Sequence, residues 1–85
     1  MIRLQVKYFA QLREQLQKEQ ESLELDGPLL VSGLIDELRL RGGPWTQALS
    51  EGQRICVAVD QEMVPLSYRL AKSAEVALFR PVTGG

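Results

Sequence analysis

The first residues of the chain alternate between apolar and polar side chains. The apolar positions are Ile2, Leu4, Val6 and Tyr8, and the polar positions between them are Arg3, Gln5 and Lys7. Because successive side chains of a strand point to opposite faces, this pattern predicts a half-buried strand. Phe9 falls on the polar side, which places its ring on the outer face or at the edge of the strand.

The period then changes from two residues to that of a helix. Leu12 and Leu16 lie on the same helical face as Phe9, in a stretch rich in the good helix formers Gln, Glu, Leu and Arg. We expect the Glu, Gln and Lys residues at 14–21 to form a solvated face. Alternation returns with Leu23 pointing inward, and an Asp-Gly-Pro sequence then predicts a turn. The pattern indicates two strands joined by a short helix.

A longer helix is predicted over residues 29–43. Its apolar stripe has the spacing i, i+3, i+4, i+7 and consists of Val31, Leu34, Ile35 and Leu38. Gly42 and Gly43, followed by proline, end it. The start is less defined, since the only candidate cap, Ser32, would begin a shorter helix.

The second half of the chain predicts short elements. In chain order we expect a helical turn at 45–52 and then a strand through Ile55, Val57 and Val59, with Cys56 and Ala58 on its other face. A turn at 60–62 leads into a short strand at 63–64. A loop at 65–74 then leads into a last strand at 75–80. In the last strand Val76 and Leu78 share one face, and Ala77 and Phe79 share the other. Pro81 has no backbone N–H and ends the pairing.

An early hairpin, one main helix and then further strands form an α+β pattern. This is the order of the ubiquitin-like β-grasp fold: a mixed sheet of about four to five strands packed on one main helix. In that fold the last strand lies inside the sheet and the chain leaves it as a free tail. We therefore expect a β-grasp domain over residues 1–80 and a flexible C-terminal tail over residues 81–85.

Composition narrows the possible chemistry. The 85 residues carry a net charge of −1 with 25% charged side chains and no basic stripe, so no nucleic-acid partner is expected. No apolar run is long enough for a membrane span, and we expect a soluble cytoplasmic protein. The chain has no histidine, which excludes Ser-His and Cys-His nucleophile pairs. Its single cysteine, Cys56, fits a small core residue better than a redox site.

The chain ends in "EVALFRPVTGG", and two terminal glycines alone would be a weak signal. Together with "YFAQLRE" near the start and "PWTQALSEGQRICVAVDQEMV" in the middle, however, the ending resembles the small subunit of molybdopterin synthase, the MoaD sulfur-carrier family. The resemblance covers nearly the whole chain. The chain departs from the family pattern in three places: Arg80 replaces the first of two prolines, residues 71–74 replace an Asp-Gly-Asp turn, and Asp60 replaces an asparagine.

The resemblance implies a protein that carries sulfur and is not itself an enzyme. An E1-like partner would use ATP to adenylate the carboxylate of Gly85, and sulfur would then replace AMP to give a thiocarboxylate. The tail with Gly84 would enter the large subunit of the synthase and donate its sulfur to a pterin precursor of the molybdenum cofactor. The resemblance implies no cofactor bound by this chain itself.

The docking surface for such partners is expected beside the tail. Phe9 and Phe79 both face away from the predicted core, and exposed aromatic rings are frequent interface residues. Arg13 and Arg80 could add charged contacts. The remaining interface candidates are the tail residues themselves: Pro81, Val82 and Thr83.

Two alternatives remain open at this point. One is a related ubiquitin-like carrier that serves thiamine synthesis or tRNA thiolation, or that is conjugated to protein lysines. The other is a β-grasp module whose tail is inert. Loss of the last two glycines distinguishes the carriers from the inert module.

Overall fold

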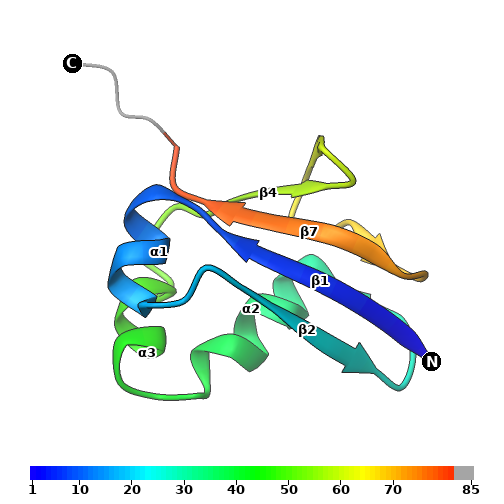
Figure 1. Ribbon diagram of the computed structural model, residues 1–85, viewed down its shortest axis with the longest axis horizontal. Helices are drawn as coiled ribbons and strands as arrows, with labels where there is room; N and C mark the ends of the chain where they lie inside the picture. Colours follow the sequence, from blue (N-terminus) through cyan, green and yellow to red (C-terminus); the bar gives the residue numbers. More distant parts are fainter. Residues whose placement is uncertain (82–85) are drawn as a thin grey trace.

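The computed structural model describes residues 1–81 of the chain (Figure 1). Its elements in chain order are β1 (Ile2–Tyr8), α1 (Ala10–Leu16), β2 (Gln20–Leu25), β3 (Leu29–Leu30), α2 (Val31–Arg39), α3 (Pro44–Ala48), β4 (Cys56–Val59), β5 (Glu62–Val64), β6 (Arg69–Leu70) and β7 (Ala74–Phe79).

The first two strands form the predicted hairpin around a short helix. β1 pairs antiparallel with β2, with Leu4 opposite Leu23, and α1 fills the connection. At the end of the hairpin next to α1, the Tyr8 N–H donates to the Glu19 carbonyl at 2.9 Å. The apolar face of β1 is buried as its alternation predicts, and Tyr8 is 1% exposed.

Five of the described strands form a mixed sheet in the order β2-β1-β7-β4-β5. β7 runs parallel to β1, with Val6 opposite Val76, and antiparallel to β4, with Val57 opposite Leu78. In Figure 1 it lies between those two neighbours. The predicted α+β architecture with the last strand inside the sheet is therefore confirmed.

A second, two-stranded sheet pairs β3 with β6, with Leu29 opposite Leu70. The prediction that residues 65–74 are only a loop is wrong at this point, because Leu70 is 1% exposed and anchors the segment to the core. The same pairing keeps residues 29–30 extended. The predicted helix therefore begins only at Val31, after Leu30 rather than after a capping Ser32.

The helices lie on one side of the large sheet (Figure 1) and share one core with it. The stripe predicted for α2 is buried in full. No polar or charged residue is buried among residues 1–81, so apolar contact alone fills this core. The largest fully buried side chains are Tyr8, Leu4, Leu12, Leu34, Leu38, Leu49, Leu70 and Leu78.

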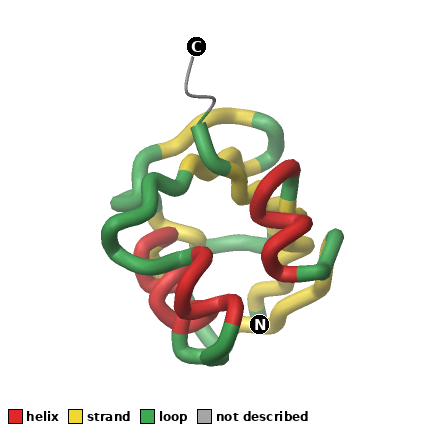
Figure 2. The backbone as a smooth tube through the Cα atoms, turned by 90° about the vertical axis from the view of Figure 1, so that its left-hand side faces the viewer, coloured by secondary structure: helices red, strands yellow, loops and turns green. Residues whose placement is uncertain are grey.

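The two ends of the described chain lie on opposite sides of the domain. Both views place the N-terminus far from the point where residue 81 leaves β7 (Figures 1 and 2). Among the helices within residues 1–81, none has the length and hydropathy needed to cross a bilayer.

Candidate functional site

The candidate site is the end of β7, where the chain passes through Arg80 to Pro81. Gly84 and Gly85, the predicted reactive residues, lie outside the described residues, as do Val82 and Thr83. The predictions for these four residues stay predictions. The structure does place the other interface candidates, which lie between β1 and α1, on α1, and at or just after the end of β7.

Phe9 and Phe79 are brought to the same end of the sheet. The parallel pairing of Tyr8 with Leu78 sets this end, and the Phe9 N–H donates to the Leu78 carbonyl at 3.2 Å. Phe9 is 45% exposed, and its carbonyl accepts from the first turn of α1. Phe79 is half-buried on the face of the sheet that the helices do not cover, opposite Cys56 of β4.

Phe79 belongs to a continuous apolar surface on that uncovered face. Ala77 of β7 lies opposite Ala58 of β4, which lies opposite Met63 of β5. Directly opposed residues of antiparallel strands share one face of the sheet. We call this set, Cys56, Ala58, Met63, Ala77 and Phe79, the outer apolar surface. Met63 is its most exposed large side chain, at 63%.

Sequence reasoning missed most of this surface. Alternation had already placed Cys56 and Ala58 on one face of their strand and Ala77 on the same face as Phe79. What the sequence lacked was the strand order, which puts β5, β4 and β7 side by side. Cys56 is therefore a half-buried residue of the outer face, not a residue of the buried core as predicted.

Arg13 lies on α1, on the other flank of the same end. Its side chain is exposed and makes no hydrogen bond or ion pair with any residue between 1 and 81. It lines a shallow pocket of about 150 Å³ together with Lys7, Phe9 and Glu19. A guanidinium group here is available to an external acceptor.

The Arg80 side chain, unlike that of Arg13, makes a contact within the domain. Its Nη2 donates to the Ala48 carbonyl at the end of α3, at 3.0 Å. Its Nε is buried and has no acceptor among residues 1–81. Arg80 is half-buried, so its visible contact is internal, and its predicted role at a partner interface stays a prediction.

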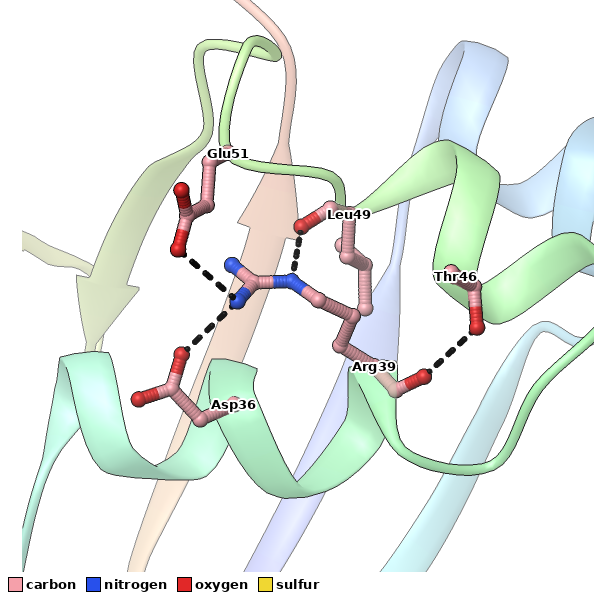
Figure 3. Close-up of polar contacts among 5 residues, drawn as sticks. All are labelled: Asp36, Arg39, Thr46, Leu49 and Glu51. Carbon is pink, nitrogen blue, oxygen red and sulfur yellow. Dashed lines mark hydrogen bonds and ion pairs between the residues drawn. The ribbon is translucent and has the colours of Figure 1, made fainter.

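A second arginine meets the same end of α3. Figure 3 shows Arg39 of α2, whose Nε donates to the Leu49 carbonyl at 2.8 Å and whose Nη1 reaches Asp36 at 3.1 Å. Glu51 lies 4.0 Å from the same Nη1. In return, Thr46 of α3 donates through Oγ1 to the Arg39 carbonyl at 2.9 Å (Figure 3). These contacts fix α3 against the end of α2.

A charged network closes the region between β1, β2 and α3. The Tyr8 hydroxyl donates to Glu21 Oε2 at 2.7 Å, and Arg41 donates to both oxygens of that carboxylate at 2.8 and 2.9 Å. The Arg41 guanidinium also lies 4.4 Å from the centroid of the Trp45 ring, which meets the Tyr8 ring edge to face. Glu21, expected on a solvated face, is instead only 14% exposed, because these distant partners enclose it.

The network shifts the pKa of each of its members. Burial, reinforced by the hydrogen bond to Glu21, holds the pKa of Tyr8 far above its ordinary value. Burial alone would raise the pKa of Glu21, but the hydrogen bonds from Arg41 and Tyr8 outweigh it and lower that pKa. The hydrogen bond to Glu21 raises the pKa of Arg41. All three shifts favour the ionised pair of Glu21 and Arg41 beside a neutral tyrosine.

The described residues offer little chemistry of their own. Within residues 1–81 no three His, Cys, Asp or Glu side chains come together as a metal site would need, and the chain has no histidine. The site does present the outer apolar surface, the exposed side chains of Phe9 and Arg13 beside it, and the strand β7, after which the C-terminal segment begins.

This arrangement defines a ubiquitin-like β-grasp protein: a mixed sheet on one side of its helices, with the C-terminal segment continuing from a strand inside the sheet. The profile of the ThiS family matches residues 6–85. The chain therefore belongs to the ThiS family.

The similarity to known relatives and solved structures covers nearly the whole of this chain. The molybdopterin synthase sulfur carrier subunit of Haemophilus influenzae is 35% identical over 82 residues, which are 96% of this chain and 99% of that protein. A solved structure, a putative molybdopterin converting factor subunit 1 from Pyrococcus furiosus, has a TM-score of 0.75 at 27% identity, and covers 96% of this chain and 100% of its own. Small archaeal modifier protein 1 of Haloferax volcanii has a TM-score of 0.73 at 25% identity, with the same coverage.

Proposed function

We propose that this protein is the sulfur-carrier small subunit of a molybdopterin synthase. The observation that carries the proposal is the full-length relationship to a protein named as that subunit, within a family match that extends to Gly85. The fold supports it, since a strand inside the sheet leads directly to the chain end.

The proposed reaction begins at the Gly85 carboxylate. A carboxylate is a poor electrophile, so an E1-like partner must first give it a better leaving group. Its oxygen attacks the α-phosphorus of ATP, pyrophosphate leaves, and an acyl adenylate forms. A sulfide-level sulfur nucleophile then attacks the acyl carbon, the bond from that carbon to the phosphate oxygen breaks, and AMP leaves, which gives a thiocarboxylate. Gly84 and Gly85 have no Cβ, and a chain end of this kind can enter a narrow channel.

The second half of the reaction takes place on the partner. The thiocarboxylate sulfur passes to a pterin precursor, and the residues that bind and activate that precursor come from the large subunit. In this proposal the chain is not an enzyme and binds no cofactor of its own. It works in the cytoplasm, with ATP supplied at the activating partner.

Docking must be driven by the domain as well as by the tail. Fixing each backbone residue costs roughly 1–2 kcal/mol, so ordering five residues from Pro81 onward costs on the order of 5–10 kcal/mol. Fully extended, these residues span about 16 Å. The outer apolar surface, with Phe9 beside it, lies at the base of the segment and offers the apolar area that can offset this cost.

The large subunit is the occupant that we propose for this surface. A solved complex of subunits 1 and 2 of molybdopterin-converting factor from Helicobacter pylori contains a chain whose fold resembles this one, with a TM-score of 0.65 at 16% identity. That likeness concerns the fold alone. The complex is nevertheless an example of a β-grasp chain that is paired with a second subunit.

Two measurements test the proposal. Incubation with the activating enzyme, ATP and a sulfur donor should raise the intact mass by about 16 Da, as one oxygen is replaced by sulfur. A variant that lacks Gly84 and Gly85 should gain no mass and form no molybdopterin with the large subunit. Molybdopterin synthesis by the truncated protein would overturn the proposal.

A second candidate function is a modifier that is joined to protein lysines, favoured by the likeness to small archaeal modifier protein 1. Carriers for thiamine synthesis or tRNA thiolation share the same terminal activation. The carriers and the modifier differ in the product. A modifier yields a covalent lysine adduct of another protein, whereas the synthase subunit yields a free thiocarboxylate that is consumed only when the large subunit and the pterin precursor are present.

A further inference from the structure

Arg80 stands where the domain ends and the C-terminal segment begins. Along β7 the side chains alternate, with Leu78 in the core and Phe79 on the outer face. Arg80 continues this alternation and returns to the helix side. There its Nη2 reaches the Ala48 carbonyl at 3.0 Å, across 32 positions of sequence.

The contact supplies a hydrogen-bond donor to a carbonyl at the C-terminal end of α3. The last carbonyls of a helix have no partner within it. Ala48 and Leu49 are 2% and 0% exposed, so water has little access to their surroundings. Arg80 donates to the carbonyl of Ala48 and Arg39 donates to the carbonyl of Leu49. Two guanidinium groups from different elements thus satisfy consecutive carbonyls.

Arginine at position 80 brings both a gain and a cost to the stability of the domain. The Arg80 Nε is buried without an acceptor among residues 1–81, and an unpaired buried donor is costly. A long apolar side chain would avoid that penalty but would leave the Ala48 carbonyl without its donor. The guanidinium group supplies a directional, charge-assisted link between the start of the C-terminal segment and a fixed point on α3.

We propose that Arg80 is a positioning residue for sulfur transfer, an inference that rests on the proposed function. Its hydrogen bond to Ala48 fixes Arg80 and Pro81 relative to α3, and therefore the point at which residues 82–85 begin. The outer apolar surface lies on the same rigid sheet. A partner docked there meets the chain end from a fixed origin, and the Gly85 thiocarboxylate reaches the pterin site in one register.

The test compares three variants of the full chain: Arg80→Ala, Arg80→Lys and Arg39→Ala. Arg39→Ala is the matched control, because it removes the neighbouring guanidinium from the same end of α3 without touching the C-terminal segment. Each protein is converted to the thiocarboxylate chemically, so that activation does not enter the result. The single-turnover rate of sulfur transfer is then measured with saturating large subunit and pterin precursor.

We expect Arg80→Ala to slow the transfer about tenfold at unchanged affinity for the large subunit, and Arg80→Lys to restore part of the rate. Arg39→Ala should stay within about twofold of the unchanged protein, although both alanine variants lower the melting temperature. Equal rates in Arg80→Ala and the unchanged protein, or equal losses in both alanine variants, would overturn the positioning role.

A second readout separates this inference from the proposed function. In the isolated 15N-labelled protein, Arg80→Ala should alter the amide shifts and heteronuclear NOE values of residues 82–85, and Arg39→Ala should leave them unchanged. Identical values in all variants would overturn the inference. If only Arg80→Ala alters these values but the thiocarboxylate of the unsubstituted protein donates no sulfur, the proposed function fails, while the link by which Arg80 orients the start of the C-terminal segment stands.

Discussion

The Tyr8 hydroxyl donates to the Glu21 carboxylate at 2.7 Å, across the end of the β1–β2 hairpin. Arg41 holds the other side of that carboxylate with two hydrogen bonds. Through Glu21, these hydrogen bonds link the buried Tyr8 of the sheet to Arg41 in the segment between α2 and α3. It secures the hairpin end near α1, which carries Arg13.

This network predicts a stability loss in acid that depends on Glu21. The folded-state pKa of Glu21 lies below the ordinary value of 4.5, so the unfolded chain binds the proton more tightly. The contribution to stability is full above that value and is lost as the pH falls through the folded-state pKa. Thermal melts from about pH 6 down to about pH 3 should therefore show the difference between the unchanged protein and Glu21→Gln shrinking on acidification.

The matched control is Glu24→Gln in the same strand. Glu24 pairs with Arg3 at 3.0 Å, but both side chains are more than half exposed, at 52% and 70%. Such a pair contributes little to stability. If Glu24→Gln lowers the neutral-pH melting temperature as much as Glu21→Gln does, burial of the network is not the cause.

The outer apolar surface predicts which substitutions weaken binding to the large subunit. Phe79→Ala and Met63→Ala should each raise Kd about fivefold or more, because truncating a central apolar contact costs more than about 1 kcal/mol. Leu40→Ala is the control, since Leu40 is 84% exposed and follows α2 on the opposite side of the sheet. Calorimetry with the purified subunit measures all three. Equal affinity for the Phe79 and Met63 variants and the unchanged protein would rule this surface out.

Cys56 provides a probe of the same surface without any substitution. It is the single cysteine of the chain, half-buried opposite Phe79. We expect alkylation of its thiol by iodoacetamide to slow when the large subunit is bound, because the partner covers the outer face. Mass spectrometry follows the reaction over time. An unchanged rate in a saturated complex would place the interface elsewhere.

The β4–β5 hairpin predicts a stabilising substitution. Its turn residues Asp60 and Gln61 have φ values of 49° and 72°, as a two-residue turn with positive φ at both positions requires. Glycine adopts this region without the penalty that a side chain meets. Gln61→Gly should raise stability by about 0.5–1 kcal/mol, or the melting temperature by about 2–8 °C.

The hairpin substitution has its own control. Asp60 must keep its side chain, because Oδ1 accepts from the Glu75 N–H at 3.0 Å. Asp60→Gly should therefore gain less than Gln61→Gly, or lose stability, in the same calorimetric scan. A lower melting temperature for Gln61→Gly would contradict the strain argument.

The sequence predicted the elements whose side chains follow a clear period. β1 and α2 were identified because alternation and the i, i+3, i+4 spacing are read directly from the chain. β6 was missed because two residues have no period. Only the pairing of Leu70 with Leu29, 41 positions earlier, makes them a strand.

The site was predictable to the same extent. Phe9 and Phe79 were found by their side of a strand, which is a local property. The place of Met63 in the outer apolar surface and the enclosure of Glu21 were not predicted, because each depends on how separate segments of the chain pack together. Arg80 was noticed as a departure from a family pattern, but its contact with Ala48 depends on where α3 packs.

The parallel pairing of β1 with β7 also has a mechanical consequence. The chain starts at the beginning of β1 and leaves at the end of β7, so a pull on the two termini slides these strands past each other along their length. All hydrogen bonds of the ladder then carry the load together, whereas a hairpin pulled from its open end breaks them one at a time. Tension between the two ends of the described chain therefore loads the β1–β7 ladder in shear, the direction in which its hydrogen bonds resist together.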